Sequence, residues 1–280
     1  MSTIPTLCGS FAGRASSVGV RVHNAAYRAM GLDYTYVAFS IQDARSAVAA
    51  LRALAMRGCA ITMPFKETVI PMLDRLDPDA AAIGAVNTIV NDGGVLTGYN
   101  TDWLAARQAL EEVTTLDGKV AVVLGAGGGG RAVCYALASR GCTVHVCNRT
   151  PARAQALVRA FDLAASHPLP AAAGPEPTGQ SQPCHYDILV NATAVGYRDP
   201  GATPIPEAWL LPDRVVMDIV PEPLETLLLA QARRRGAVCV PGWRMRVLQA
   251  AAQFRLYTGQ EPPLDVMETE LLAAIAPSRD

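Results

Sequence analysis

The sequence predicts an α/β protein built from two domains, the second of which is a doubly wound parallel sheet. Two observations lead to this fold class. Short apolar runs alternate with amphipathic runs of helix length from the first residues onward, which is the pattern of strands and helices taken in turn. A chain of 280 residues, of which 50% are hydrophobic, is also long enough for its core to divide into two.

The first hundred residues show this alternation clearly. Apolar runs predict strands at residues 3–9, 34–39 and 59–63. Amphipathic or alanine-rich runs predict helices at residues 22–30, 44–56 and 80–84. Residues 87–100 predict a β-hairpin, because Asp92-Gly93-Gly94 supplies turn residues between two alternating runs.

A second set of elements begins after Lys119. Apolar runs predict strands at residues 120–125, 142–150, 186–193, 214–220 and 237–240. Amphipathic runs predict helices at residues 131–141, 224–235, 243–257 and 264–276. Residues 165–184 are rich in Pro, Ala, Gly, Ser and Gln and lack periodicity, so we expect a loose surface loop there.

The order of these elements suggests where the domains meet. We expect an N-terminal domain of residues 1–104 and a second domain of residues 105–242. Residues 243–280 follow the last strand of the second sheet, and we expect their helices to pack back on the first domain and complete it.

Charge and composition exclude several classes of partner. The formal net charge is -1, so neither nucleic acid nor a membrane surface is expected as the main partner. The first residues lack the features of a signal peptide and no run is long enough to cross a bilayer, so we expect a soluble cytoplasmic protein. The four histidines are dispersed and predict no metal site. Seven cysteines without a CxxC pair, mostly in apolar contexts, are typical of buried thiols.

A glycine-rich turn, GAGGGG at residues 125–130, lies between a predicted strand and a predicted helix. Glycines at this place allow a tight turn and let a pyrophosphate approach the helix N-terminus closely. The position of the motif therefore favours a dinucleotide-binding Rossmann domain. The alternative is a tight turn between strand and helix with no ligand.

The end of the following strand indicates which dinucleotide is bound. An NAD enzyme would place a carboxylate there, whereas this chain has Asn148-Arg149-Thr150, with Arg153 one turn later. Two guanidinium groups and two small polar groups suit a 2′-phosphate, so we expect NADP. Alternatively, Arg149 and Arg153 only solvate a helix start, although cations there oppose the helix macrodipole unless an anion binds.

Lysine is almost absent from the chain. Lys66 and Lys119 are the only two, and arginine supplies the remaining basic charge. An ammonium group can release its proton, which a guanidinium cannot do, so Lys66 is a candidate for proton transfer. The alternative is a solvated lysine beside Glu67 at the start of a helix.

Several motifs together resemble the shikimate dehydrogenase family along nearly the full chain. They are GCAITMPFKE, IGAVNTIV, GYNTD, VLGAGGGGRA, CNRT, LVNAT, VVMDIV followed by Pro223 and Thr226, and PGWRMRVLQAAAQF. The resemblance implies an N-terminal substrate-binding and catalytic domain and an NADP-binding Rossmann domain. It also implies reduction of the ketone of 3-dehydroshikimate to shikimate with NADPH; some relatives act on quinate instead.

The resemblance assigns roles position by position. Lys66 and Asp102 match the catalytic pair, which fits the need for a proton donor near the alkoxide that hydride transfer leaves. Asp102 could also cap a helix that begins at Trp103, and the two roles are compatible. The matching substrate-binding positions are Ser17, Thr62, Asn87 and Gln249. The matching cofactor positions are Gly125, Ala126, Gly127, Gly128, Gly129, Asn148, Arg149, Thr150, Arg153, Asn191, Thr193, Ile219 and Gly242.

The departures from the family pattern lie on or near the substrate side. Typical members carry Ser-x-Ser-Pro-x-x-His-Asn, whose serines bind the substrate carboxylate; here Ser17 remains, but Gly19 and Val20 replace the second serine and the proline. The preceding segment, GSFAGRASS, is longer than usual. The other departures are Ala60 for an asparagine, Pro221 for a tyrosine, Ala194 and Tyr197 in a loop pattern of the family, and Arg246 at a normally apolar position.

The lost serine raises the question of what holds the carboxylate. We expect Arg246 or Arg14 to replace it through a bidentate, charge-assisted contact, so Arg246 joins the candidate substrate-binding residues. The alternative is that both arginines are solvated surface.

These observations predict an NADP-dependent oxidoreductase that acts on shikimate or a related cyclic hydroxy acid, as a monomer or homodimer. A quinate-type dehydrogenase is one alternative. A non-catalytic NADPH-sensing protein is another, although retention of both Lys66 and Asp102 argues against it. Glutamyl-tRNA reductases share the glycine-rich turn and the Asn-Arg-Thr strand end, but their chemistry needs a reactive cysteine and a basic RNA-binding surface that this sequence lacks.

Overall fold

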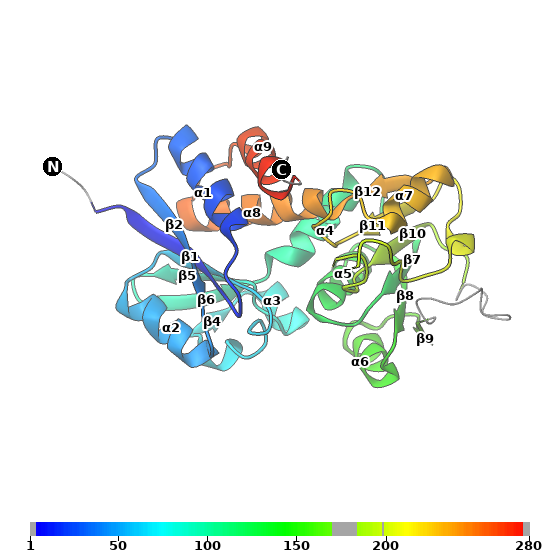
Figure 1. The fold of residues 1–280 in the computed structure, drawn as a ribbon. Coiled ribbons are helices and arrows are strands. Elements are labelled where there is room, and N and C mark those ends of the chain that lie inside the picture. Colours follow the sequence, from blue (N-terminus) through cyan, green and yellow to red (C-terminus); the bar gives the residue numbers. More distant parts are fainter. Residues whose placement is uncertain (1–3, 170–183, 198, 277–280) are drawn as a thin grey trace. The chain divides into compact units, whose positions relative to one another are not determined.

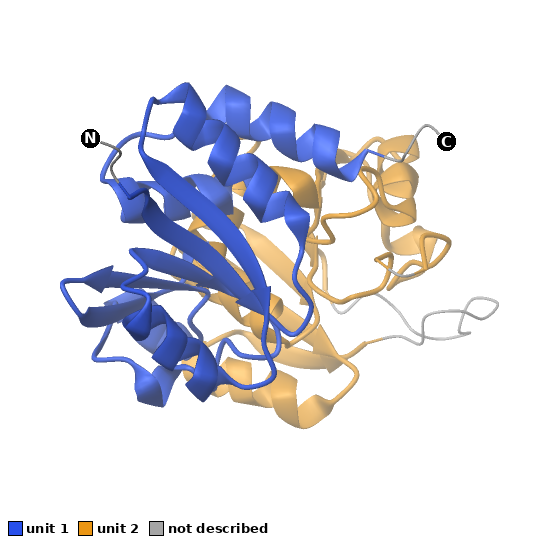
Figure 2. Cartoon of the chain, turned by 60° about the vertical axis from the view of Figure 1, so that its left-hand side comes forward, with its two compact units in different colours: residues 1–101, 247–280 blue, residues 102–246 orange. Residues whose placement is uncertain are grey.

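The structure is a computed structural model that describes residues 4–169, 184–197 and 199–276 (Figure 1). The chain divides into two compact units (Figure 2). Unit 1 comprises residues 1–101 and 247–280, and unit 2 comprises residues 102–246. We expected the chain to change domain after residues 104 and 242; the units change after residues 101 and 246.

Unit 1 contains a mixed six-stranded sheet with the strand order β2-β1-β3-β5-β6-β4. Its strands are β1 (Thr6–Ala12), β2 (Tyr34–Ser40), β3 (Gly58–Ile61), β4 (Arg75–Leu76), β5 (Thr88–Asp92) and β6 (Val95–Tyr99). β1 pairs in parallel with β2 and β3, whereas β5 pairs antiparallel with β3 and β6. The predicted hairpin is confirmed, with Gly93 and Gly94 at positive φ in the turn between β5 and β6.

The helices of unit 1 begin where the sequence supplies caps. They are α1 (Ser17–Ala29), α2 (Ala44–Ala53), the short η1 (Ile70–Met72), α3 (Pro78–Ile83), α9 (Leu264–Ile275) and α8 (Gly242–Thr258) from residue 247 onward. The side chains of Ser16, Asp43 and Asp77 accept hydrogen bonds from the first turns of α1, α2 and α3. Because of the Ser16 cap, α1 begins at Ser17 rather than at residue 22 as we expected.

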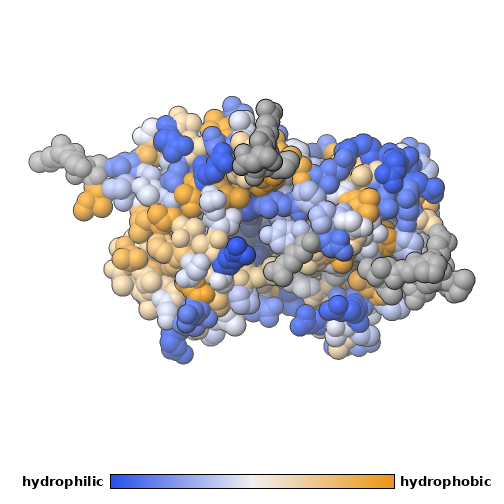
Figure 3. Space-filling view, viewed as in Figure 1, coloured by the Kyte–Doolittle hydropathy of each residue, from blue (hydrophilic) through white to orange (hydrophobic). Residues whose placement is uncertain are grey.

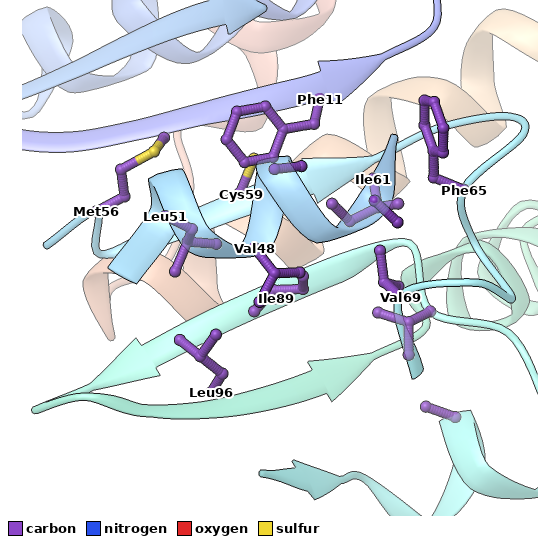
Figure 4. Packing of buried hydrophobic residues seen from close by; sticks show 14 residues of the cluster. Phe11, Val48, Leu51, Met56, Cys59, Ile61, Phe65, Val69, Ile89 and Leu96 are labelled. Atoms are coloured by element: carbon purple, nitrogen blue, oxygen red, sulfur yellow. The ribbon is translucent and has the colours of Figure 1, made fainter. Parts of the chain in front are cut away.

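The two faces of this sheet are filled differently. Phe11, Cys59, Ile61 and Ile89 pack against Leu51 and other apolar residues of α2 and the following loop (Figure 4). On β3 the side chains of successive residues alternate between faces, so Gly58 and Ala60 lie on the side opposite Cys59 and Ile61. There Gly58 leaves room for the ring of Tyr257 from α8, which a Cβ atom at residue 58 would meet at 2.3 Å.

Unit 2 contains a parallel six-stranded sheet with the strand order β12-β11-β10-β7-β8-β9. Its strands are β7 (Val120–Leu124), β8 (Thr143–Asn148), β9 (Ala165–Pro168), β10 (Ile188–Asn191), β11 (Val215–Asp218) and β12 (Val238–Val240). Its helices are α4 (Thr101–Glu111, from residue 102), α5 (Gly128–Ala138), α6 (Pro151–Phe161), η2 (Glu207–Trp209) and α7 (Leu227–Arg234). The order, which runs outward in both directions from the central β7, confirms the predicted doubly wound Rossmann sheet.

One element of unit 2 corrects the sequence prediction. We expected a loose loop over residues 165–184, but residues 165–168 form β9, which pairs with β8 from His145↔Ala165 to Asn148↔Pro168. An edge strand pairs with a neighbour on one side only. A short segment without a clear hydrophobic period can therefore form such a strand through its backbone hydrogen bonds. Residues 170–183 of the expected loop lie outside the described residues.

Most cysteines are buried, as expected, and those in the described part of the chain are free thiols. In the space-filling view hydrophilic side chains gather over α7, where Arg233 and Arg234 are exposed (Figure 3). Among the described helices, none has the length and apolar character required to span a bilayer.

Candidate active site

Lys66 lies in the turn that follows β3. The turn is anchored on both sides of the lysine, because Phe65 and Val69 are buried and the carbonyl oxygen of Lys66 accepts a hydrogen bond of 2.8 Å from the amide of Val86. Its side chain is half-buried. The next helical element, η1, begins only at Ile70, so Lys66 and Glu67 lie in a turn and not at the start of a helix.

Asp102 lies in the first turn of α4 and is only 5% exposed. We expected the helix to begin at Trp103 with Asp102 as a possible cap, but it begins at Thr101. The amide of Thr101 donates to Asn87 Oδ1 at 2.7 Å, so Asn87 supplies the acceptor at this helix end. An acidic residue in the first turn of a helix interacts favourably with the helix macrodipole.

The candidate substrate-binding residues of unit 1 differ in exposure. Ser17, the first residue of α1, and Thr62, which follows β3, are exposed. Gln249 on α8 is half-buried, and Asn87, immediately before β5, is 0% exposed. Asn87 Nδ2 donates to Thr101 Oγ1 at 3.0 Å, so the amide of Asn87 is held on both of its polar atoms.

The two arginines proposed to replace the lost serine have different surroundings. Arg246 belongs to unit 2, and its Nη1 donates to Glu222 Oε1 at 3.1 Å. Arg14 is exposed. The ion pair with Glu222 therefore occupies Nη1 of Arg246, which restricts the orientation of its guanidinium group.

Gly19 lies in the first turn of α1, at the position where the family pattern has a serine. A Cβ atom at residue 19 would lie 3.5 Å from Cε1 of Tyr36, which is ordinary van der Waals contact. The ring of Tyr36 is buried and stacks on His23 with 4.3 Å between the ring centroids. The backbone and its neighbours therefore accommodate a small side chain at residue 19.

The glycine-rich turn between β7 and α5 combines two kinds of glycine. Gly125 has φ +102, and a Cβ atom at Gly130 would lie 2.1 Å from the carbonyl oxygen of Gly125. These two glycines are required by the fold itself. At Gly127 and Gly128, in contrast, an added Cβ atom would meet nothing within 4 Å. The open space beside the N-terminus of α5 fits the close approach of a pyrophosphate.

The candidate cofactor residues at the end of β8 surround the start of α6. Asn148 Oδ1 accepts from the amide of Ala126 at 3.1 Å, which ties the strand end to the glycine-rich turn. Arg149, Thr150 and Arg153 are exposed, and the first turn of α6 contains no acidic residue. Two exposed guanidinium groups and a helix N-terminus together form a surface suited to a phosphate.

A buried group at the ends of β10 and β11 holds further cofactor candidates. Asn191 Oδ1 accepts from the amide and the hydroxyl of Thr193, and Asn191 Nδ2 donates to Asp218 Oδ1 at 2.9 Å. Asp218 also accepts from the amide of Val220 and the hydroxyl of Thr226. Burial raises the pKa of Asp218 to about 6 despite these three donors. The sequence did not indicate that Asp218, which ends the strand motif VVMD, is the hydrogen-bond partner of Asn191.

The last two cofactor candidates, Ile219 and Gly242, also lie against these elements. A Cβ atom at Gly129 would lie 2.6 Å from Ile219 Cδ1, so this isoleucine packs on the start of α5. A Cβ atom at Gly242 would lie 2.1 Å from the carbonyl oxygen of Val220, so only glycine fits at the start of α8. Unit 2 thus brings most of its candidates to one end of the parallel sheet.

Comparison with known families decides what these units are. Residues 14–89 match the shikimate dehydrogenase substrate binding domain, residues 106–173 match shikimate / quinate 5-dehydrogenase, and residues 242–272 match the shikimate 5'-dehydrogenase C-terminal domain. A protein of Moorella thermoacetica named shikimate dehydrogenase (NADP(+)) is 44% identical over 94% of this chain and 90% of its own length. The chain belongs to the shikimate dehydrogenase family.

Two further relatives of the family agree with this result. A shikimate dehydrogenase (NADP(+)) of Methanothermobacter thermautotrophicus is 40% identical, over 89% of each chain. The crystal structure of shikimate 5-dehydrogenase from Thermus thermophilus, in complex with NADP(H) and shikimate, is 36% identical and superimposes with a TM-score of 0.86. That superposition covers 96% of this chain and 98% of the other. The predicted family and fold class are confirmed, whereas the roles of individual residues stay predictions.

The two kinds of glycine in this family member make a matched pair of variants. We expect Gly130→Ala to destabilise the protein by about 3 kcal/mol, because its Cβ atom would overlap the backbone of Gly125. We expect Gly128→Ala to leave the melting temperature unchanged or slightly higher, yet to weaken NADP binding about tenfold, because its methyl group enters the pyrophosphate space. Thermal unfolding and NADP titration of both variants test this; equal melting temperatures would contradict it.

Proposed function

We propose that this protein is an NADP-dependent dehydrogenase that interconverts 3-dehydroshikimate and shikimate, or a closely related pair of cyclic keto and hydroxy acids. The observation that carries the proposal is the match, over 94% of the chain, to a relative named shikimate dehydrogenase (NADP(+)). The open space at Gly127 and Gly128 and the exposed Arg149 and Arg153 support the choice of cofactor.

The chemistry assigned to unit 1 and α4 is proton transfer. Bound NADPH supplies a hydride to the ketone carbon, which leaves negative charge on the oxygen. In the proposal the ammonium of Lys66 donates a proton to that oxygen, and in the reverse direction the neutral amine accepts the hydroxyl proton. The carboxylate of Asp102 orients the ammonium and accepts a hydrogen bond from a neighbouring hydroxyl of the substrate.

The residues of unit 2 bind the cofactor in this proposal. Asn148, Arg149, Thr150 and Arg153 hold the 2′-phosphate, for which exposed guanidinium groups provide charge-assisted hydrogen bonds. The turn from Gly125 to Gly129 holds the pyrophosphate, and the remaining contacts come from Asn191, Thr193, Ile219 and Gly242.

Recognition of the substrate is assigned to Ser17, Thr62, Asn87 and Gln249, which bind its carboxylate and ring hydroxyls. Arg14 or Arg246 adds a contact to the carboxylate. If Arg14→Ala and Arg246→Ala each leave the KM of every accepted acid unchanged, neither arginine has this role.

Gly19 provides a direct test of how the carboxylate is bound. We expect Gly19→Ser to lower the KM for the accepted acid about tenfold, because a hydrogen bond to a charged group is worth about 1.5–3 kcal/mol. Gly19→Ala adds the same Cβ atom without the hydroxyl and serves as the control. The Cβ atom that both variants add is in ordinary van der Waals contact with Tyr36. Equal KM values for the serine and alanine variants would show that no carboxylate lies near residue 19.

The proposal also covers the cellular compartment of the enzyme and its partners. We infer that it acts in the cytoplasm, where free thiols stay reduced, as a monomer or homodimer and without a nucleic-acid partner. Initial rates of NADP and NAD reduction with shikimate, quinate and related cyclic hydroxy acids test the function. Rapid turnover of shikimate with NADP is the expected result. A strong preference for another acid would identify a substrate pocket with changed specificity. Reduction of neither cofactor by any acid would favour a non-catalytic NADPH-sensing protein.

A further inference from the structure

We propose that Gln253 is a positioning residue. It fixes the position of Asn87 relative to α8, the helix that carries Gln249. Neither the family pattern nor the sequence analysis assigned it a role. The inference rests on the proposed function, since Asn87 and Gln249 are the side chains expected to bind the ring hydroxyls of the substrate.

A chain of buried hydrogen bonds leads from Gln253 to Asn87. Gln253 Nε2 donates to Thr88 Oγ1 at 3.0 Å. Because a hydroxyl has one proton and accepts here from Gln253, that proton is available to Asn87 Oδ1, which Thr88 Oγ1 contacts at 2.9 Å. Asn87 Oδ1 also accepts from the amide of Thr101, which can only donate. The amide of Thr101 therefore fixes the oxygen of the Asn87 side chain as the acceptor.

The direction of these bonds fixes the orientation of the Asn87 amide. Its oxygen accepts from the Thr88 hydroxyl and the Thr101 amide, and its nitrogen donates to Thr101 Oγ1. A reversed amide would place its NH2 group against the amide proton of Thr101, which is unfavourable in a site that is 0% exposed. Gln253 adds a donor to the Thr88 hydroxyl, whose own oxygen lies 2.9 Å from Asn87 Oδ1 and 3.4 Å from Thr101 Oγ1.

Two side chains can donate to the Thr88 hydroxyl: the amide of Gln253 on α8, at 3.0 Å, and the hydroxyl of Thr101, at 3.4 Å. The residue paired with Thr88 on the neighbouring strand β3 is Ala60. Ala60 supplies only a methyl group, at a position where the family pattern has an asparagine. Gln253 comes from the helix that lies over this face and is itself 4% exposed. A buried amide whose hydrogen bond crosses from a helix to a strand gives both elements a fixed relative position.

Gln249 lies on the same helix, one turn before Gln253. Residues four positions apart on an α-helix share a face. A hydrogen bond that fixes Gln253 against β5 therefore also fixes the position of Gln249 along the helix axis and the direction in which its side chain extends. The neighbouring His23 is buried and stacked on Tyr36. Its burial lowers its pKa to about 4, so Gln253 lies beside an uncharged imidazole at neutral pH.

The test is a double-mutant cycle with steady-state kinetics on the full-length protein. Gln253→Met and Thr88→Val keep the volume of each side chain and remove the hydrogen bond. We expect each to raise the KM for shikimate about tenfold, with the KM for NADP unchanged and kcat lowered by no more than about threefold. The double variant is expected to be no worse than Thr88→Val alone, because that substitution already removes the hydrogen bond to Gln253 together with the one to Asn87.

Thr258→Val is the matched control, since both hydrogen bonds of Thr258 Oγ1 stay at the end of α8: it donates to the carbonyl oxygen of Phe254 and accepts from the amide of Gln260. This variant should leave the KM for shikimate unchanged. A Gln253→Met protein that melts earlier but keeps the wild-type KM would show a merely structural role and overturn the inference. Effects of the two substitutions that multiply in the double variant would overturn it as well.

Wild-type turnover in the same series separates this inference from the proposed function. If the wild-type protein oxidises shikimate and the KM values do not move, only the positioning role of Gln253 is wrong. If the wild-type protein oxidises none of the cyclic hydroxy acids, the proposed function fails and the inference fails with it.

Discussion

Replacement of Lys66 by alanine is expected to lower kcat by about three orders of magnitude, because a positioned proton donor contributes on the order of 10²–10⁴ in rate. Lys66→Arg should be almost as inactive, since a guanidinium keeps the charge but does not release its proton at neutral pH. The binding of NADP should change little in both variants, because Lys66 belongs to unit 1 and the expected cofactor residues belong to unit 2. Steady-state kinetics with NADP and the accepted acid, together with NADP titration, provide the measurement.

The chain supplies its own control for this experiment, because Lys119 is the only other lysine. Lys119 precedes β7, and only its backbone takes part in the hydrogen bond to Leu116. Lys119→Ala should therefore keep wild-type kcat. Substantial activity of Lys66→Arg would contradict proton transfer by this residue and would favour a purely electrostatic role.

The second large effect concerns the choice of cofactor. We expect Arg149→Ala and Arg153→Ala each to raise the KM for NADP about tenfold or more, since a hydrogen bond to a charged group is worth about 1.5–3 kcal/mol. The KM for NAD, which lacks the 2′-phosphate, should stay unchanged. The double variant should therefore lose most of its preference for NADP, and kinetics with both cofactors measure that ratio.

Arg159 is the matched control, because it is also an exposed arginine of α6 but lies in the last turn of the helix. Arg159→Ala should leave both KM values unchanged. A uniform loss of NADP and NAD binding in the Arg149 and Arg153 variants would instead show that these arginines support the fold or the adenosine site, and that the phosphate is bound elsewhere.

Much of the fold could be predicted from the sequence, because hydrophobic period and turn residues are local signals. The strand, glycine-rich turn and helix at residues 120–141 and the hairpin around Gly93 are examples. The start of α1 was misplaced because Ser16, one of several small polar residues in a row, acts as the cap. β9 was missed because its stability comes from pairing with β8, which composition does not reveal.

The candidate site was predictable where residue type alone points to chemistry. An isolated lysine and a pair of arginines after a strand are such signals. What the sequence did not reveal are partners that meet only in three dimensions, such as Gln253 with Thr88, Asp218 with Asn191, and Arg246 with Glu222. In each case the two residues are more than twenty positions apart, and no local sequence pattern indicates that they form a hydrogen bond.

The most direct test of the account is the fate of the hydrogen that leaves the substrate. Shikimate that carries deuterium on the carbon bearing the oxidised hydroxyl would be incubated with the purified protein and NADP, and the reduced cofactor analysed by mass spectrometry. Direct hydride transfer predicts one deuterium atom in each molecule of NADPH formed by the wild-type protein, and proton transfer by Lys66 predicts almost no NADPH formed by Lys66→Ala. Reduced cofactor without deuterium, or no reduction by shikimate or any related cyclic hydroxy acid, would contradict it.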